Sequence, residues 1–174
     1  LTGLYDAKLD HMPVLAITGQ APRTVRGAHY QQELNLDRVF ADVAKYVQEI
    51  EAPSQIRVVT DRAIRIAKAE RGVSALVIPG DLQDEPYHDP PRQHGSVFSG
   101  VGYAKPKIVP YEADLRRAAE VLNAGKKVAI LVGAGALQAT DEVIAVADRL
   151  AAGAAKALLG KAALPDDLPW VTGS

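Results

Sequence analysis

The chain has 174 residues, enough for one domain or two small ones; 48% of them are hydrophobic and 24% are charged. Its 20 basic and 21 acidic residues give a net charge of −1, which does not predict the clustered basic face of a nucleic-acid-binding protein. There is no cysteine, so a disulfide scaffold, a thiolate metal site and a cysteine nucleophile are excluded. No apolar run reaches the roughly 20 residues of a membrane span, and no signal peptide is visible. These features fit a cytoplasmic protein whose contact with membranes is at most peripheral.

The sequence looks cut at both ends of the chain. The opening LTGLYDAKLD has the apolar stripe of a helix over residues 1–10 but no N-cap, and the closing WVTGS forms no element. The chain is therefore expected to be a piece of a longer protein, and a trimmed tag or a processed terminus is the alternative.

Predicted strands and helices alternate along the first half. Residues 14–18 form a continuous apolar run between Pro13 and Gly19, which predicts a parallel strand covered on both faces. The elements expected after it are a helix capped by Asp37 and ending at Ala44, a strand over 45–50, a helix over 53–70 and a strand over 74–78. This alternation implies right-handed βαβ units in an open parallel sheet.

The alternation stops over residues 80–110, which hold five prolines and four glycines and therefore read as an interdomain linker. It then restarts with the following predicted elements: a helix over 111–123 with Gly125 just beyond it, a strand over 127–132, a helix capped at Thr140-Asp141 and running to 151, and a strand over 154–159. The expected fold class is α/β: open parallel sheets with flanking helices, in two partial doubly wound domains joined by a linker. The predicted divisions are 1–82, 83–110 and 111–174.

A Gly-x-Gly turn follows the strand predicted in VAILVGAGA. Gly133 and Gly135 would let a backbone approach a ligand at the carboxyl end of a parallel strand, where a helix N-terminus favours an anion. The full dinucleotide fingerprint needs a third glycine, but Gln138 occupies that position. Spacing alone therefore leaves two alternatives open, a ligand-binding turn and a tight βα turn with no ligand.

Other polar groups carry weaker signals. The four histidines, at 11, 29, 88 and 94, lack the spacing of metal ligands, and only His29, in a glutamine-rich loop, is a candidate functional residue. The acidic cluster of Asp81, Asp84 and Glu85 is expected to be a solvated turn. The basic run along the third predicted helix is expected to face solvent: Arg57, Arg62, Arg65 and Lys68.

Several motifs in a fixed order now suggest a family. They are GLYDAKLDHMPVLAITGQ, YQQE, FADVAKYV, IPGDLQ, LVGAGA and LLGKAALPDDLPWVTG. Together they resemble the thiamine-diphosphate-dependent enzymes of the pyruvate oxidase, quinone-dependent pyruvate dehydrogenase and acetolactate synthase group. The resemblance covers essentially the whole chain, and DAKLDHMPVLAITGQ and the GK-x-x-LPDD loop are its most specific parts.

The resemblance implies how this chain fits a three-domain enzyme. Residues 1–82 would be the C-terminal half of the pyrimidine-binding domain, and 111–174 the N-terminal half of the central, FAD- or nucleotide-binding-like domain. The glutamate that activates the cofactor's aminopyrimidine would lie before Leu1, and the Mg²⁺ and diphosphate ligands after Ser174. The implied cofactors are thiamine diphosphate, Mg²⁺ and FAD, but the 174 residues alone are expected to be inactive.

The resemblance also answers why an apolar strand opens into so polar a loop. In the family this loop lines the cofactor cleft and carries Phe-Gln-Glu, which here reads Gln31-Gln32-Glu33. Gln32 would donate an amide hydrogen bond to the substrate carboxylate or to the bound intermediate, and Gln20 would support Gln32 from behind. The aromatic residue is replaced by Gln31, although Tyr30 could supply a ring from a different direction. The alternative is that Gln20 and Gln32 only satisfy the loop backbone.

Flavin contacts are implied in three places. The turn at Gly133, Ala134 and Gly135 matches a flavin-contacting turn, Leu158 and Leu159 match a second contacting stretch, and Arg71 is a candidate third contact. The implied reaction is decarboxylation of a 2-keto acid, most simply pyruvate, followed by oxidation of the resulting enamine. An acetolactate synthase-type carboligase is one alternative and a non-catalytic α/β binding or structural module is another. The parent protein would be a homo-oligomer, a dimer of dimers.

Overall fold

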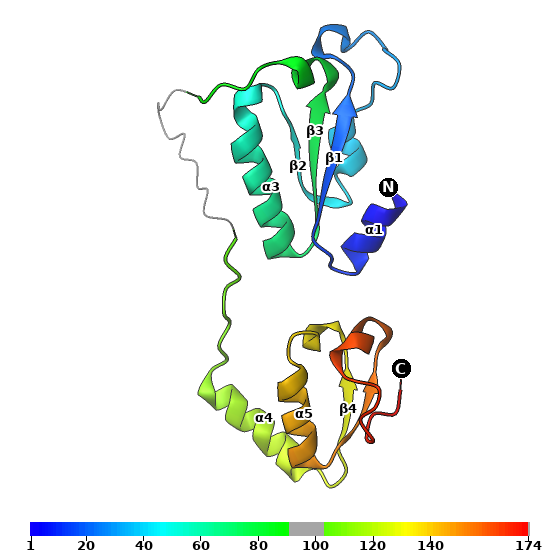
Figure 1. Ribbon diagram of the computed structural model, residues 1–174, viewed down its shortest axis with the longest axis vertical. Helices are drawn as coiled ribbons and strands as arrows, with labels where there is room; N and C mark the ends of the chain where they lie inside the picture. The colour runs from blue at the N-terminus through cyan, green and yellow to red at the C-terminus, as the bar shows by residue number, and fades with distance from the viewer. Residues whose placement is uncertain (91–102, 174) are drawn as a thin grey trace. The chain divides into compact units, whose positions relative to one another are not determined.

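The computed structural model describes residues 1–90 and 103–173 and divides the chain into two compact units (Figure 1). The first unit is Leu1–Pro106 and the second is Lys107–Ser174. Most of the predicted linker thus belongs to the first unit, although its residues 91–102, with His94 among them, lie outside the described part of the chain.

The first unit is built on a three-stranded parallel sheet, as the sequence predicts. Its strands are β1 (Val14–Gln20), β2 (Ala44–Glu49) and β3 (Val73–Pro79), in the spatial order β1-β3-β2. The central strand β3 is buried at almost every position. Two-sided coverage was predicted for β1, and this is wrong: β1 is an edge strand, and its Ile17 is 63% exposed.

Helices lie on both faces of this sheet (Figure 1). They are α1 (Thr2–Leu9), α2 (Leu36–Phe40) and α3 (Ile56–Glu70). The first two share one apolar cluster with the sheet, in which Phe40 and Val43 pack on Val73 and Ala75. The long helix α3 buries Ala63 and Ala67 against the strands. Burial of an apolar face on each side is what holds a doubly wound sheet together.

The residues predicted to cap and to end α2 are both wrong. The Asn35 side chain, not that of Asp37, caps this helix, because its Oδ1 accepts the Arg38 backbone N–H at 3.0 Å. The helix ends at Phe40 rather than Ala44, since Ala44 already pairs with Val73 as the first residue of β2.

The second unit repeats the α/β pattern on a smaller scale. Its elements are α4 (Glu112–Ala124), β4 (Ala129–Val132), α5 (Thr140–Leu150) and β5 (Gly153–Lys156), and the two strands pair in parallel. An isolated bridge joins Ala154 to Val171. The buried cluster lies between these elements and the closing loop: Val132, Ala154, Ala163 and Leu164.

Three details of the second unit differ from prediction. Strand β5 ends at Lys156 instead of Leu159, because the next residues turn into a 3₁₀ helix over Leu158–Ala163. The Thr140 hydroxyl does not cap α5; it donates to the Ala163 carbonyl oxygen at 2.8 Å. Gly125 follows α4 as predicted but with a φ of −72°, so the helix end does not use glycine's left-handed freedom.

Candidate functional sites at two sheet edges

The carboxyl ends of β1, β2 and β3 meet at one edge of the first sheet, because the strands are parallel. The loop over residues 21–35 leaves β1 at this edge and leads to α2. A polar cavity of about 350 Å³ opens beneath it, and its lining residues are Gln20, Arg26, His29, Glu33, Leu34, Asn35, Leu36, Asp37 and Glu49. In open α/β sheets this edge is where ligands bind.

Gln20 closes the base of this loop. Its Nε2 donates to the Leu34 carbonyl oxygen at 2.7 Å, and its Oε1 accepts the Ala21 backbone N–H at 2.9 Å. The side chain therefore joins the end of β1 to the end of the loop. Both hydrogen bonds of the Gln20 side chain thus go to the backbone of the loop, as the alternative to a functional role predicts. A role of Gln20 in supporting a substrate-binding residue stays a prediction.

Gln32 lies on the same loop but not in the wall of the cavity. Its side chain is exposed, and its φ of 63° is unusual for a residue other than glycine. The turn before it is held by Glu33, whose carboxylate accepts the backbone N–H groups of Gly27 at 2.7 Å and Tyr30 at 3.1 Å. These two bonds lower the pKa of Glu33, because they favour the charged form of the carboxylate.

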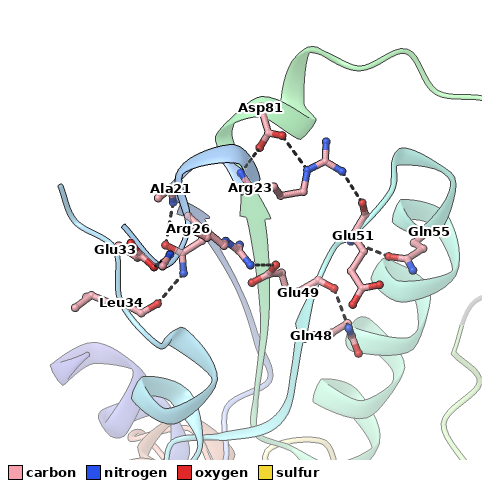
Figure 2. A network of polar contacts seen from close by, with 12 residues as sticks. Ala21, Arg23, Arg26, Glu33, Leu34, Gln48, Glu49, Glu51, Gln55 and Asp81 are labelled. Atoms are coloured by element: carbon pink, nitrogen blue, oxygen red, sulfur yellow. Dashed lines mark hydrogen bonds and ion pairs between the residues drawn. The ribbon is translucent and has the colours of Figure 1, made fainter. Parts of the chain in front are cut away.

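Arg23 is a residue of this edge that sequence reasoning missed. Its backbone N–H donates to Asp81 Oδ1 at 3.0 Å, its Nε to Asp81 Oδ2 at 2.8 Å and its Nη1 to the Glu51 carbonyl oxygen at 2.8 Å (Figure 2). Its Nη2 pairs with Glu85. Asp81 and Glu85 thus lie in a partly solvated turn, as predicted, but both are also paired with Arg23, which was not predicted. The N–H groups of Arg23 hold the pKa of Asp81 below its usual value. The only signal in the sequence was that Arg23 and Asp81 each follow closely on a predicted strand.

Arg26 and Glu49 form an ion pair in the cavity wall (Figure 2). The Nε and Nη2 atoms of Arg26 are buried and have no hydrogen-bond partner among the described residues. His29, the candidate among the histidines, lines the same cavity with a φ of 54°. The first site is thus a polar, charge-rich edge.

Arg71 lies at the opposite edge of this sheet. It ends α3 in a left-handed conformation, two residues before β3 begins, and its Nε donates to the His11 carbonyl oxygen at 3.3 Å. The structure therefore does not bring Arg71 together with Gln20 and Gln32, and its contact with flavin stays a prediction.

The second site lies at the carboxyl edge of β4 and β5. A short 3₁₀ helix over Ala134–Ala136 follows Gly133, and the helix over Leu158–Ala163 follows β5. Gly160 packs directly on the first turn: a Cβ added there would lie 2.5 Å from the Val132 carbonyl oxygen and 2.6 Å from the Gly133 carbonyl carbon. The structure thus brings together the two stretches predicted to contact flavin. Leu158 and Leu159 beside them are 82% and 52% exposed.

Gly133 and Gly135 are not required by this packing. A Cβ added to either glycine would meet nothing within 4 Å, and the φ of Gly133 is −109°, a value that any residue adopts. Their missing side chains instead leave the backbone open to approach. An open glycine turn beside exposed leucines fits a ligand with a flat apolar ring and a polar chain, so these residues could hold FAD.

A buried lysine anchors the loop of this second edge, and no sequence pattern predicts it. The Lys156 side chain is fully buried; its Nζ donates to the Leu164 carbonyl oxygen at 3.0 Å and pairs with Asp166. The hydrogen bond and charge of Lys156 lower the pKa of Asp166. This pair fixes the LPDD part of the loop to the end of β5.

The described residues, 1–90 and 103–173, lack two further features. They contain no group of three or more histidine or carboxylate side chains placed to hold a metal ion. None of their helices is long and apolar enough to cross a membrane.

Comparison with known proteins identifies the class. Residues 115–174 match the family model described as "Thiamine pyrophosphate enzyme, central domain", and these residues lie in the second unit. The chain belongs to the thiamine-diphosphate-dependent enzyme family.

Three relatives illustrate the similarity. The chain is 34% identical over its whole length to YdaP of Bacillus subtilis, which is described as thiamine pyrophosphate-containing, and 35% identical over 82% of its length to the pyruvate oxidase of Lactiplantibacillus plantarum. It is 29% identical over 99% of its length to an acetolactate synthase of Arthrospira platensis. The chain spans 29%, 23% and 30% of the lengths of these three proteins.

Proposed function

We propose that this chain is a segment of a thiamine-diphosphate- and FAD-dependent enzyme that decarboxylates pyruvate and oxidises the product. The observation that carries the flavin part is the open turn of Gly133 and Gly135 beside Leu158 and Leu159, because packing within the unit does not explain these glycines. The similarity to a pyruvate oxidase supports the choice of substrate and reaction.

The residues of the first edge would handle the substrate. When bound, thiamine diphosphate supplies the carbon nucleophile and the electron sink for decarboxylation, and it would be held with Mg²⁺ by residues outside this chain. Gln32 would donate its amide N–H to the substrate carboxylate, which orients the keto group and fixes the carboxylate that leaves as carbon dioxide. Gln20, bonded to Ala21 and Leu34, would keep the loop in one shape.

The residues of the second edge would hold the electron acceptor. The backbone of Gly133, Ala134 and Gly135 would approach FAD closely, and Leu158 and Leu159 would cover its apolar surface and exclude water. We place the complete enzyme in the cytoplasm and expect it to be a homo-oligomer, a dimer of dimers.

An acetolactate synthase-type carboligase is the second candidate. The similarity to an acetolactate synthase over nearly the whole chain favours it. In such an enzyme the same flavin edge would serve structure more than electron transfer, so the chemistry of the flavin separates the two candidates.

The test is the visible spectrum of the complete protein that carries this segment, before and after anaerobic addition of pyruvate. A flavin spectrum that bleaches with pyruvate supports the oxidase. A flavin spectrum that stays oxidised while pyruvate is converted to acetolactate supports the carboligase. Failure to bind FAD after reconstitution contradicts the role of the Gly133 turn, and failure to consume pyruvate contradicts the enzymatic function and favours a non-catalytic α/β module.

A further inference from the structure

The loop over residues 21–35 is held at its start by a single side chain that reaches the ends of all three strands. Arg23 follows β1, its partner Glu51 follows β2, and its partner Asp81 follows β3 (Figure 2). A further partner, Glu85, also follows β3. The guanidinium donates through Nε, Nη1 and Nη2 at once, in the planar fork that distinguishes arginine from lysine. The loop is therefore fixed to the sheet in position and in direction.

This frame extends toward Gln32. Gln20 closes the loop base through Leu34, and Glu33 holds the turn of Gly27 and Tyr30. Within the described residues no hydrogen bond of the Gln32 side chain is present, so the position of its amide depends on the backbone that carries it. That backbone has a left-handed conformation, which persists only where the surrounding structure enforces it.

A contribution to stability does not explain why Arg23 makes so many bonds at this edge. The Arg23 side chain is 34% exposed and those of Asp81 and Glu85 are 28% and 43% exposed, so solvent screens these ion pairs and each adds little to stability. What the arrangement does provide is geometry, because four bonds from one residue define the orientation of the loop start.

We infer that Arg23 is a positioning residue: by joining the loop to the three strand ends, it holds Gln32 where its amide meets the substrate carboxylate. This inference rests on the role proposed for Gln32. It assigns to Arg23 no contact with substrate or cofactor. Its loss should therefore act only through Gln32, and this can be measured.

The experiment is a double-mutant cycle in the complete protein, with pyruvate consumption followed in the presence of thiamine diphosphate, Mg²⁺, FAD and an artificial electron acceptor. Arg23→Met is expected to lower kcat/KM about 10- to 100-fold, since misplacement of a positioned group by about 1 Å costs on this order. In the Gln32→Ala background the same change should cost less than about twofold, because the group it positions is already gone.

Two variants complete the design. Arg23→Lys keeps the charge without the fork and should restore only part of the activity, which also covers the case in which Arg23→Met does not fold. Arg38→Met is the matched control, since Arg38 is exposed on α2 and, among the described residues, bonds only through its backbone N–H, to Asn35. It should leave kcat and KM unchanged.

The outcomes separate this inference from the proposed function. If Gln32→Ala lowers activity and the two changes multiply independently, Arg23 does not act through Gln32 and the inference is wrong, while the proposed function stands. If Arg23→Met leaves kcat/KM unchanged, the inference is wrong in the same way. If Gln32→Ala itself has no effect on an active protein, the role of Gln32 and the inference built on it both fail.

Discussion

The loop that follows β1 and the loop that follows β5 both leave the carboxyl edge of a parallel sheet, but they are held in different ways. The first is tied down by side chains that span the edge, with Arg23 bonded to Asp81 and Glu51. The second is held by close backbone packing at Gly160 and by one buried amine, that of Lys156.

This difference matches the ligands that each edge would accept. An edge of polar side chains offers donors and acceptors that can be aimed at a small charged substrate. An edge of glycines and exposed leucines offers open backbone and apolar area, which suits a large ligand with a flat ring. In the first unit, the proposed function depends on the geometry of side chains. In the second unit, it depends on backbone that glycine residues leave uncovered.

The largest effect is expected at Gly160. Gly160→Ala would place a methyl group 2.5 Å from the Val132 carbonyl oxygen, against backbone that cannot yield, and should lower the free energy of unfolding of the second unit by about 3 kcal/mol. Urea denaturation followed by the fluorescence of Trp170 measures this, because Trp170 is the chain's one tryptophan and packs on the core of that unit.

Gly133→Ala is the matched control for that prediction. Nothing lies within 4 Å of the added Cβ, so stability should change by less than about 1 kcal/mol. In the complete protein the same change should weaken FAD binding roughly tenfold, about 1.4 kcal/mol. Equal destabilisation by the two substitutions would contradict the distinction between a glycine that packing requires and a glycine that leaves room for a ligand.

Lys156 should have the next largest effect. Lys156→Met keeps the length of the side chain but leaves the buried Leu164 carbonyl oxygen without its donor, which should cost about 1 to 3 kcal/mol of unfolding free energy in the same fluorescence experiment. Lys161→Met, in the same loop but exposed, should change it by less than about 0.5 kcal/mol. A Lys156→Met protein as stable as the parent would mean that apolar packing replaces the amine at no cost.

The sequence was informative wherever local patterns decide the structure. The continuous apolar run over residues 14–18 and the helix predicted over 53–70 match β1 and α3 within a few residues, because apolar patterning along a strand or helix is a local requirement. The open glycine turn at Gly133 and its neighbour Leu158 were also found from sequence and lie together.

Long-range partners could not be predicted in this way. Arg23 and Asp81 are 58 residues apart, and nothing near either residue specifies the other. The same is true of strand order: the apolar runs of β1 and β3 look alike, yet only β3 lies in the centre of the sheet and is covered on both faces. Such outcomes depend on how distant segments meet rather than on local preference.

The smallest effect concerns the end of the first loop, where Asn35 rather than Asp37 caps α2. Asn35→Ala removes the acceptor of the Arg38 backbone N–H and should lower the free energy of unfolding of the first unit by about 1 kcal/mol. Hydrogen exchange at the Arg38 amide should accelerate, since its partner is lost. Asp37→Ala should leave that amide as protected as before, because Asp37 contributes only its charge to the first turn. If Asp37→Ala exposes the amide and Asn35→Ala does not, the cap belongs to Asp37, and the loop that carries Gln32 ends two residues later than the structure places it.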